Sequence, residues 1–480
     1  MILWFVILYL LASVGIGLYA ARRVHSTKDF AVAGRTLPLP VVTATVFATW
    51  FGAETVLGIP ATFVKEGLRG VVADPFGSSL CLILAGLLFA RRLYRLNVLT
   101  IGDYYRIRYN RTVEVLCTLC IVASYLGWVS AQIKALGLIF HVVTDGAVAQ
   151  PLGMVIGAAI VLTYTTFGGM FSVAILDFVQ ITVIMGGMLY IGSVISSLTG
   201  GVAAVVTHAG SAGKLAFFPS AGITAWIPFI GAWMTMMLGS IPQQDVFQRI
   251  TSAKDERTAV RGSVLGGSLY FLFAFVPMFL AYSATLVDPD RFGALLARDS
   301  QLVLPTLILQ HTPPAAQVIF FGAVLSAIMS CASATLLAPS VAFSENIVKG
   351  MVPGMSDRAF LQTMRTVLVC FTAVVLSFAL SSDATIFKMV ESAYKITLVS
   401  AFIPLFAGLY WPRATSTGAL LSIGSGLSTW IALELFGHSA VWPPQLVGFL
   451  IAAAGMILGS LLSPLGNQAS VPPRNAATSA

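Results

Sequence analysis

Three ionisable residues, Glu54, Lys134 and Asp177, lie inside long apolar segments of the sequence. A charged side chain at the centre of a bilayer costs about 2.5–3.5 kcal/mol on insertion scales, so each residue needs a partner or a water-filled cavity. Side chains of this kind line ion and solute pathways or relay protons. The chemistry that these residues can perform is therefore the binding and passage of charged species.

Each of the three residues also has a purely structural interpretation. Glu54 and Lys134 can form a static ion pair, or the long Lys134 side chain can extend to the membrane surface. A buried lysine can alternatively take the place of a bound cation or exchange a proton. Asp177 can lie on the route of an ion, or it can simply reach the lipid headgroups.

The rest of the sequence carries no pattern that is typical of an enzyme. It has no nucleophile-elbow, HExxH or phosphate-loop motif, and its five histidines are scattered. The five cysteines, an odd number, all fall in apolar segments, which argues against a disulfide framework. We therefore expect that the protein is not an enzyme.

Apolar helices must hold these residues in place. Of the 480 residues, 57% are hydrophobic and only 10% are charged, whereas soluble domains carry about 25% charged residues. Apolar runs of about 20 residues, separated by short polar loops, predict membrane-spanning helices. We count thirteen, centred near residues 12, 51, 82, 127, 157, 186, 233, 274, 331, 371, 398, 426 and 453. The expected fold is an all-α membrane protein with one domain over residues 1–465 and a disordered cytoplasmic tail over residues 466–480.

Basic residues predict the orientation of these spans. With the N-terminus outside and the C-terminus in the cytoplasm, nineteen of the 27 Lys and Arg residues fall in cytoplasmic segments and five in external ones. Such an excess on the inner face is the rule for membrane proteins. It also accounts for the net charge of +8, so we expect no nucleic-acid partner. The expected location is a plasma membrane of the bacterial inner-membrane type.

Two spans contain residues that interrupt a helix. Gly52, Gly58 and Pro60 fall in the second span, and Gly239 and Pro242 fall in the seventh. In transporters, unwound backbone at the membrane midplane leaves carbonyl oxygens for a cation and helix N-termini for anionic groups.

The two breaks lie five spans apart, as in a pair of inverted five-helix repeats. The pattern predicts one repeat over residues 39–198 and a second over residues 225–408. It leaves an extra first span over residues 1–21 and two last spans over residues 417–463. These features favour a secondary transporter.

Several stretches, taken together and in order, resemble the sodium/solute symporter family. They are Gly34-Arg35, Leu37-Pro38, Thr45–Pro60, Leu99–Arg106, Tyr164–Gly169, Asp177–Gln180, Gln243–Arg249, Leu325–Ser330, Leu336-Leu337 and Ser344-Glu345. Within the family the chain is most similar in appearance to the high-affinity choline transporter branch. The resemblance implies a leucine-transporter-like fold with a 5+5 inverted repeat and two broken helices. It also places Asp177 on the cytoplasmic route of the ion.

The resemblance implies a sodium site at the first break. Its expected ligands are the carbonyl oxygens of Ala48, Phe51 and Ala327, the Ser330 hydroxyl, and the side chain at position 331. That side chain is Cys331, where the family normally has Ser or Thr. A thiol is a soft ligand that suits a hard cation poorly. The coupling ion is therefore sodium bound with weakened affinity, or a proton instead.

The resemblance also implies a solute site at the centre of the membrane. Trp50 and Trp128 match aromatic positions of a cation–π cage, although aromatic residues in membrane helices can also serve packing alone. The cage is incomplete, because Gln243 and Ser78 stand at two other aromatic positions. Glu54 and Gln244, with Asp74 nearby, make the expected pocket more polar.

This composition fits a solute that forms hydrogen bonds better than it fits choline. The predicted function is cation-coupled symport of a small organic solute into the cell, with the ion most simply sodium. The alternatives are a proton-coupled or ion-independent transporter of the same fold, and a membrane sensor of solutes.

The predicted topology can be tested with reporter fusions. Fusions after Arg23, Arg108, Lys254 and Arg413 should report a cytoplasmic location, and those near Lys214 and Arg291 an external one. The reason is the excess of basic residues on the inner face. An external signal after Arg108 or Lys254 would contradict the thirteen-span topology.

Overall fold

The computed structural model describes residues 2–220, 222–437 and 441–463, and these are almost entirely helical. No strand occurs among them, and one isolated bridge joins Leu37 to Ala253. The expected all-α fold is confirmed. The expected tail over residues 466–480 lies outside the described residues.

Ten helical segments are long and apolar enough to cross a membrane. Six consist of one helix each: α1 (Ile2–Ala21), α8 (Arg111–Val143), α9 (Gln150–Leu198), α19 (Asp357–Ser381), α22 (Ser416–Phe436) and α23 (Pro444–Leu462). The other four are composed of consecutive helices. Leu68–Arg95 contains η3 (Leu68–Val71), η4 (Val72–Gly77), α5 (Ser78–Leu84), η5 (Ala85–Ala90) and α6 (Arg91–Arg95), and Glu256–Val287 contains α13 (Glu256–Phe273) and α14 (Phe275–Val287). Pro314–Met351 contains α17 (Pro314–Phe343), η7 (Ser344–Val348) and α18 (Lys349–Met351), and Ile386–Tyr410 contains α20 (Ile386–Thr397), η8 (Leu398–Phe402) and α21 (Ile403–Tyr410).

Two further spans are bent, as expected from their glycines and prolines. In the first, α3 (Leu39–Trp50) is followed after a short break by η2 (Glu54–Gly58) and α4 (Ile59–Glu66), with a bend of 55°. In the second, α11 (Ile223–Gly239) and α12 (Gln244–Ser252) meet at 45°. The two predicted broken helices are confirmed, and they raise the number of candidate spans to as many as twelve.

The thirteenth predicted span depends on how α9 is divided. This helix of 49 residues is roughly 74 Å long at 1.5 Å per residue, more than twice the thickness of a bilayer core. Its backbone leaves the helical conformation at Gly169, with φ 48° and ψ −140°. The two predicted spans centred near residues 157 and 186 fall on either side of this glycine. The count of thirteen rests on that division and stays a prediction.

Short helices connect the spans. They are α2 (Thr27–Val32), η1 (Ala33–Arg35), α7 (Ile101–Arg108), α10 (Val202–Ser211), α15 (Pro289–Arg298), η6 (Ser300–Leu302) and α16 (Val303–His311).

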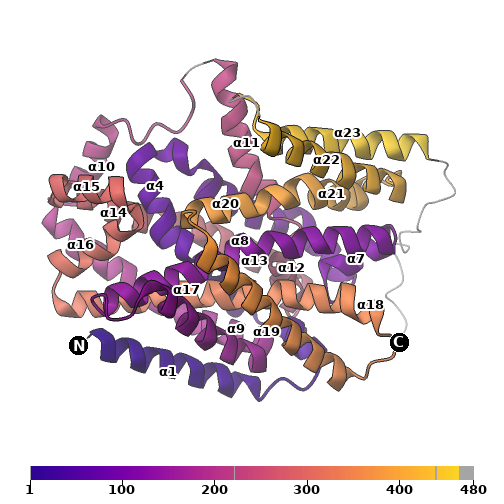
Figure 1. Cartoon of the computed structure of the whole chain (residues 1–480), viewed down its shortest axis with the longest axis horizontal. Helices are drawn as coiled ribbons and strands as arrows, with labels where there is room; N and C mark the ends of the chain where they lie inside the picture. Colours follow the sequence, from indigo (N-terminus) through magenta and orange to yellow (C-terminus); the bar gives the residue numbers. More distant parts are fainter. Residues whose placement is uncertain (1, 221, 438–440, 464–480) are drawn as a thin grey trace.

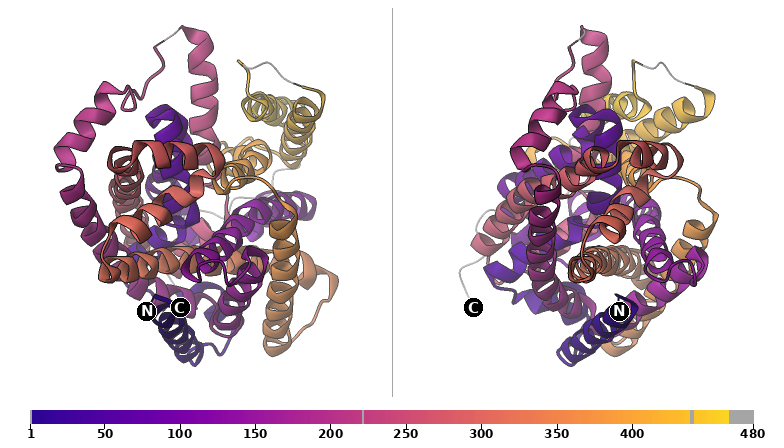
Figure 2. Two further views of the ribbon diagram at one scale, coloured as in Figure 1. Left: turned by 60° about the vertical axis from the view of Figure 1, so that its left-hand side comes forward. Right: turned by 90° about the vertical axis from the view of Figure 1, so that its left-hand side faces the viewer.

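The span that contains α17 forms the centre of the bundle. In its most apolar stretch 89% of the residues are buried, against 22% in α1 and in α22. α17 packs against α8, α9, α3 and α19 (Figure 1). α1 and the α22–α23 pair lie on opposite sides of the molecule in every view (Figures 1 and 2). Residues on α3, α8, α9 and α17 can therefore form the core of an enclosed site.

The bend of α9 at Gly169 can be tested by substitution. Its conformation suits only glycine, and an added Cβ would lie 2.4 Å from the Phe30 carbonyl oxygen. We expect Gly169→Ala to lower the melting temperature of the purified protein, because backbone strain of this kind costs about 1–3 kcal/mol.

Gly186→Ala, on the same helix, is the control for Gly169→Ala. An added Cβ there has no atom within 4 Å, so the melting temperature should stay near that of the parent protein. Equal melting temperatures for the two variants would contradict the importance of the Gly169 conformation.

Candidate ion and solute site

The first break releases backbone carbonyl groups from helical hydrogen bonding. The Gly52 amide donates to the Trp50 carbonyl at 3.0 Å, and the Ala53 amide donates to Gln132 Oε1 at 2.9 Å. In an unbroken helix these two amides would donate to the carbonyls of residues 48 and 49. The carbonyl of Ala48, an expected sodium ligand, thereby loses its helical partner.

The Asp177 carboxylate joins this broken span to the central helix. It accepts hydrogen bonds from the Thr45 hydroxyl on α3 and from the Ser330 hydroxyl on α17, and all three side chains are buried. Asp177 and Ser330, which were predicted separately, are thus in direct contact. Thr45 belongs to the same group, and the sequence analysis did not single it out as a ligand.

Cys331 lies beside the break. A Cβ added at Gly52 would be 2.7 Å from the Cys331 sulfur, so glycine is required for this close approach. Ala327 is also fully buried, one helical turn earlier on α17. Backbone oxygen, hydroxyl, carboxylate and thiol groups thus lie along the C-terminal half of α3 and at its end, and all except the thiol are hard ligands of the kind that alkali and alkaline-earth cations prefer.

Glu54 is held by α8 through neutral donors. Its carboxylate accepts from Trp128 Nε1 at 3.1 Å and from Gln132 Nε2 at 2.6 Å. Gln132 also accepts from the Ala53 amide, so one side chain binds both the backbone and the acid of the break. The interpretation of Glu54 and Lys134 as an ion pair is wrong, because the acid bonds to these two residues instead.

Lys134 points away from this centre. Its ammonium group donates to the carbonyls of Ser382 and Ala384, at 2.9 and 2.8 Å. It lines a cavity of about 300 Å³ together with Arg298 and Asp383. The structure therefore does not bring Lys134 to the proposed ion site, and the alternative of an outward-extending side chain describes its geometry.

Four aromatic rings form a cluster around Trp128. Its ring centroid lies 5.3 Å from that of Trp50, 5.4 Å from that of Tyr394 and 5.9 Å from that of Tyr125. Trp50 also stacks on Tyr394 at 5.8 Å. The two predicted tryptophans are thus adjacent. The sequence analysis missed both tyrosines, although Tyr125 is three residues before Trp128 and so shares its helix face.

The second break contributes amide and carboxylate groups. Gln243 Nε2 donates to the Ser124 hydroxyl at 2.8 Å, and its Oε1 is buried without a partner in the described part of the chain, as is Asp245 Oδ2. Gln244 differs, because its Oε1 accepts from the Ile101 amide at the start of α7. The structure thus separates Gln244 from the other predicted solute ligands.

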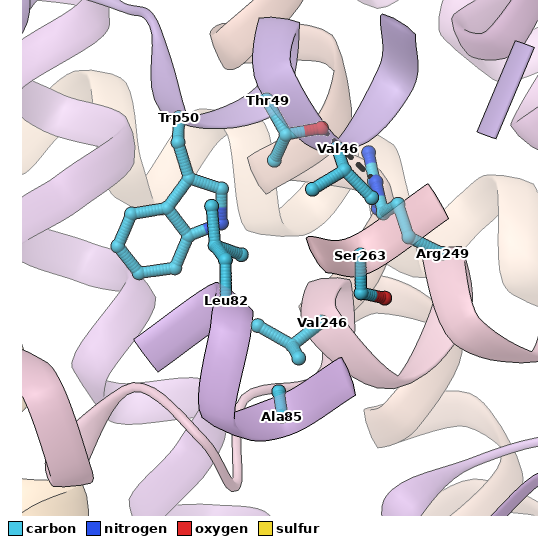
Figure 3. A pocket seen from close by; sticks show the side chains of 8 residues that line it. All are labelled: Val46, Thr49, Trp50, Leu82, Ala85, Val246, Arg249 and Ser263. Atoms are coloured by element: carbon cyan, nitrogen blue, oxygen red, sulfur yellow. Dashed lines mark hydrogen bonds between the residues drawn. The ribbon is translucent and has the colours of Figure 1, made fainter. Parts of the chain in front are cut away.

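Arg249 is a fully buried cation that the sequence analysis did not single out. Its Nε donates to the Thr49 hydroxyl at 3.0 Å, beside a cavity of about 10 Å³ that could hold about one water (Figure 3). Trp50 lines the opposite side of this cavity. The guanidinium group acts electrostatically on both Asp177 and Asp245 and so offsets part of the negative charge of the site.

Ser78 belongs to a second group of polar side chains near Glu54. Its hydroxyl donates to Asp74 Oδ1, which also accepts from the Tyr270 hydroxyl at 2.6 Å. The Tyr270 hydroxyl lies 3.0 Å from the hydroxyl of Thr55, the residue after Glu54. The polar surroundings that were predicted for Ser78 are therefore centred on a second buried carboxylate.

Comparison with known proteins identifies relatives along nearly the whole chain. The model of the sodium:solute symporter family matches residues 30–426. The human high affinity choline transporter 1 is 28% identical over 88% of this chain and 75% of its own. The human sodium/iodide cotransporter is 26% identical over 91% of this chain and 70% of its own. An osmoregulated proline transporter of Bacillus subtilis (strain 168) is 24% identical over 96% of this chain and 95% of its own.

Solved structures share the fold at lower identity. A Na+-coupled sialic acid symporter in a substrate-bound outward-open state superposes with a TM-score of 0.82 and 18% identity, covering 96% of this chain and 98% of its own. MhsT in complex with L-phenylalanine gives a TM-score of 0.54 with 16% identity, over 88% of this chain and 98% of its own. The predicted leucine-transporter-like fold is thereby confirmed.

The position of Lys134 leads to a prediction about sodium. Lys134→Ala should leave unchanged the sodium concentration that gives half-maximal thermal stabilisation of the purified protein, because its ammonium group bonds elsewhere. Asp177→Asn, measured alongside, should raise that concentration. A loss of the sodium response in Lys134→Ala would mean that the lysine acts on the ion site after all.

Proposed function

The chain belongs to the sodium:solute symporter family, and we propose that it takes up one small organic solute together with sodium through the space between its two broken spans. It is an integral membrane protein and a transporter, and sodium is its coupling ion. The residues that bind the ion and the solute, and the direction of transport, are the parts that we propose.

In this proposal sodium binds where α3 breaks beside α17. The ligands are the carbonyl oxygens of Ala48, Phe51 and Ala327, together with the Ser330 hydroxyl and, as a weak fifth ligand, the Cys331 thiol. The single observation that carries the proposal is the Asp177 carboxylate, which accepts hydrogen bonds from Ser330 and from Thr45 across three different helices. An ionised buried carboxylate needs positive charge nearby, which Arg249 supplies in part and a cation at this junction would complete.

The solute site lies on the other side of the same break. Trp50 and Trp128 supply aromatic faces, Glu54 a carboxylate, and Gln243 and Ser78 further polar groups. Trp50 directly precedes Phe51, so an ion that fixes the Phe51 carbonyl also orders the Trp50 ring. Coupling follows, because sodium binding favours the conformation in which the solute site is complete.

We also propose the orientation and internal symmetry. The first repeat covers residues 39–198 and the second covers residues 225–408, each beginning with a broken span. The distribution of basic residues supports an external N-terminus and a cytoplasmic C-terminus in a plasma membrane of the bacterial inner-membrane type.

Removing the Ser330 hydroxyl tests the ion site. Ser330→Ala should raise the sodium concentration for half-maximal stabilisation roughly tenfold, equivalent to about 1.4 kcal/mol, because one hard oxygen ligand is lost. The measurement is thermal stabilisation of the purified protein by sodium chloride, with potassium chloride keeping the ionic strength constant.

Ser340→Ala is the matched control for this experiment. Ser340 lies on the same helix and is fully buried, but its hydroxyl donates to the Leu336 carbonyl within its own helix. Its sodium response should equal that of the parent protein. If Ser330→Ala also behaves like the parent protein, the proposed ion site is wrong.

A further inference from the structure

Two buried carboxylates beside the first break have no basic partner. Glu54 is bonded by the Trp128 indole and the Gln132 amide, and Asp74 is bonded by the hydroxyls of Ser78 and Tyr270. All of these donors are neutral. Ion pairs at 4.0 Å or less among the described residues include neither carboxylate.

The basic side chains closest to the centre serve other groups. Arg249 acts on Asp177 and Asp245, and Lys134 donates to two backbone carbonyls at a different cavity. Asp74 lies near enough to act electrostatically on Glu54, so the two acids repel each other when both are ionised. Ionised carboxylates in a buried site are stable only when paired. The pair can therefore be ionised together only when a cation from outside the chain lies beside it.

One atom of the pair is free to bind it. Asp74 Oδ2 is buried and has no hydrogen-bond partner among the described residues, whereas Oδ1 accepts two hydrogen bonds. An unbonded buried carboxylate oxygen is costly, so it is typical of a site that a ligand completes. The hydroxyls of Tyr270 and Thr55 connect this acid to the backbone next to Glu54.

A cavity approaches the two acids from one side. A cavity of about 500 Å³ lies between α4, η4, α11 and α20, and its lining includes Gly58 and Ala73. Gly58 is one helical turn after Glu54, and Ala73 directly precedes Asp74. The cavity also carries charged residues of both signs, including Lys65, which suits a polar solute. The cavity thus ends within one helical turn of each acid along the chain, although neither acid lines it.

The aromatic cluster favours an organic cation over a metal ion at this position. Trp128 donates its indole N–H to Glu54, and its ring lies against Trp50 and Tyr394. An ammonium group is attracted to such ring faces, most strongly when it is desolvated. Sodium, as a hard cation, prefers a shell of oxygen ligands instead.

We infer that the transported solute is a protonated amine with at least one N–H, recognised by Glu54 and by the free oxygen of Asp74. This inference rests on the proposed function and specifies its substrate class. The carboxylates select for the N–H because they accept hydrogen bonds, which a quaternary ammonium group cannot donate. They also exclude carboxylate anions through like-charge repulsion.

The test measures thermal stabilisation of the purified protein in sodium by pairs of amines. Primary, secondary and tertiary amines from methylamine to spermidine are each compared with the fully methylated quaternary counterpart. We expect at least one N–H amine to bind roughly tenfold or more tightly than its quaternary counterpart. Equal or tighter binding of the quaternary member, or stabilisation by none of the amines, would overturn the inference.

Variants locate the effect. Glu54→Gln and Asp74→Asn should each weaken amine binding at least tenfold, and either variant that folds is sufficient for the test. Glu434→Gln is the matched control, because Glu434 also accepts from an indole, Trp430 Nε1 at 3.1 Å, but pairs with Lys395 on the periphery. Unchanged amine affinity in a folded Glu54→Gln or Asp74→Asn protein would contradict the assignment.

A measurement with sodium but no amine distinguishes a failure of this inference from a failure of the proposed function. Stabilisation by sodium chloride in the absence of any amine reports the ion site at Ser330 and Asp177. If sodium stabilises the parent protein while the amines do not, only the substrate class is wrong. If sodium fails to stabilise the parent protein, the proposed ion site itself fails.

Discussion

The packing of the broken span against the central helix depends on one carboxylate, which accepts hydrogen bonds from side chains of both. Asp177 on α9 binds the hydroxyls of Thr45 and Ser330, and so connects the broken span to the central helix inside the membrane. In a low-dielectric interior such bonds are strong, and the negative charge needs compensation. Arg249 supplies part of it, and a sodium ion beside Ser330 supplies the rest in our proposal. In this proposal, loss of the ion would leave part of the negative charge of Asp177 uncompensated, so sodium binding would stabilise the observed position of α3.

The break itself is stabilised by side chains. Gln132 accepts from the Ala53 amide and donates to Glu54, so the free backbone of the break and its acid share one partner. Gly52 permits this geometry, because a Cβ there would lie 2.8 Å from Gln132 Oε1 and 2.7 Å from the Cys331 sulfur. In our proposal the ion site and the solute site therefore meet at this glycine, so that a change in one is transmitted to the other.

The spans and their breaks could be predicted from the sequence, because apolar length, glycine and proline act locally. The partners of Asp177 could not, since Thr45 and Ser330 lie 132 and 153 residues away and only the fold brings them together. The sequence left open whether Glu54 pairs with Lys134, and the structure decides against that pair for a geometric reason. Gln132 follows Trp128 by four residues and shares its helix face, whereas Lys134, two residues further, points to the other side. Helix periodicity applied to Trp128 would have favoured Gln132 over Lys134.

The central claim is that sodium binds between the first break and Ser330, with Cys331 as its one poor ligand. Direct binding of radioactive sodium to the purified protein tests it, in the parent protein and in Cys331→Ser. A hydroxyl at position 331 would replace a soft sulfur with a hard oxygen, so the account predicts a lower sodium dissociation constant for the variant. An unchanged or higher dissociation constant in a folded Cys331→Ser protein would contradict it.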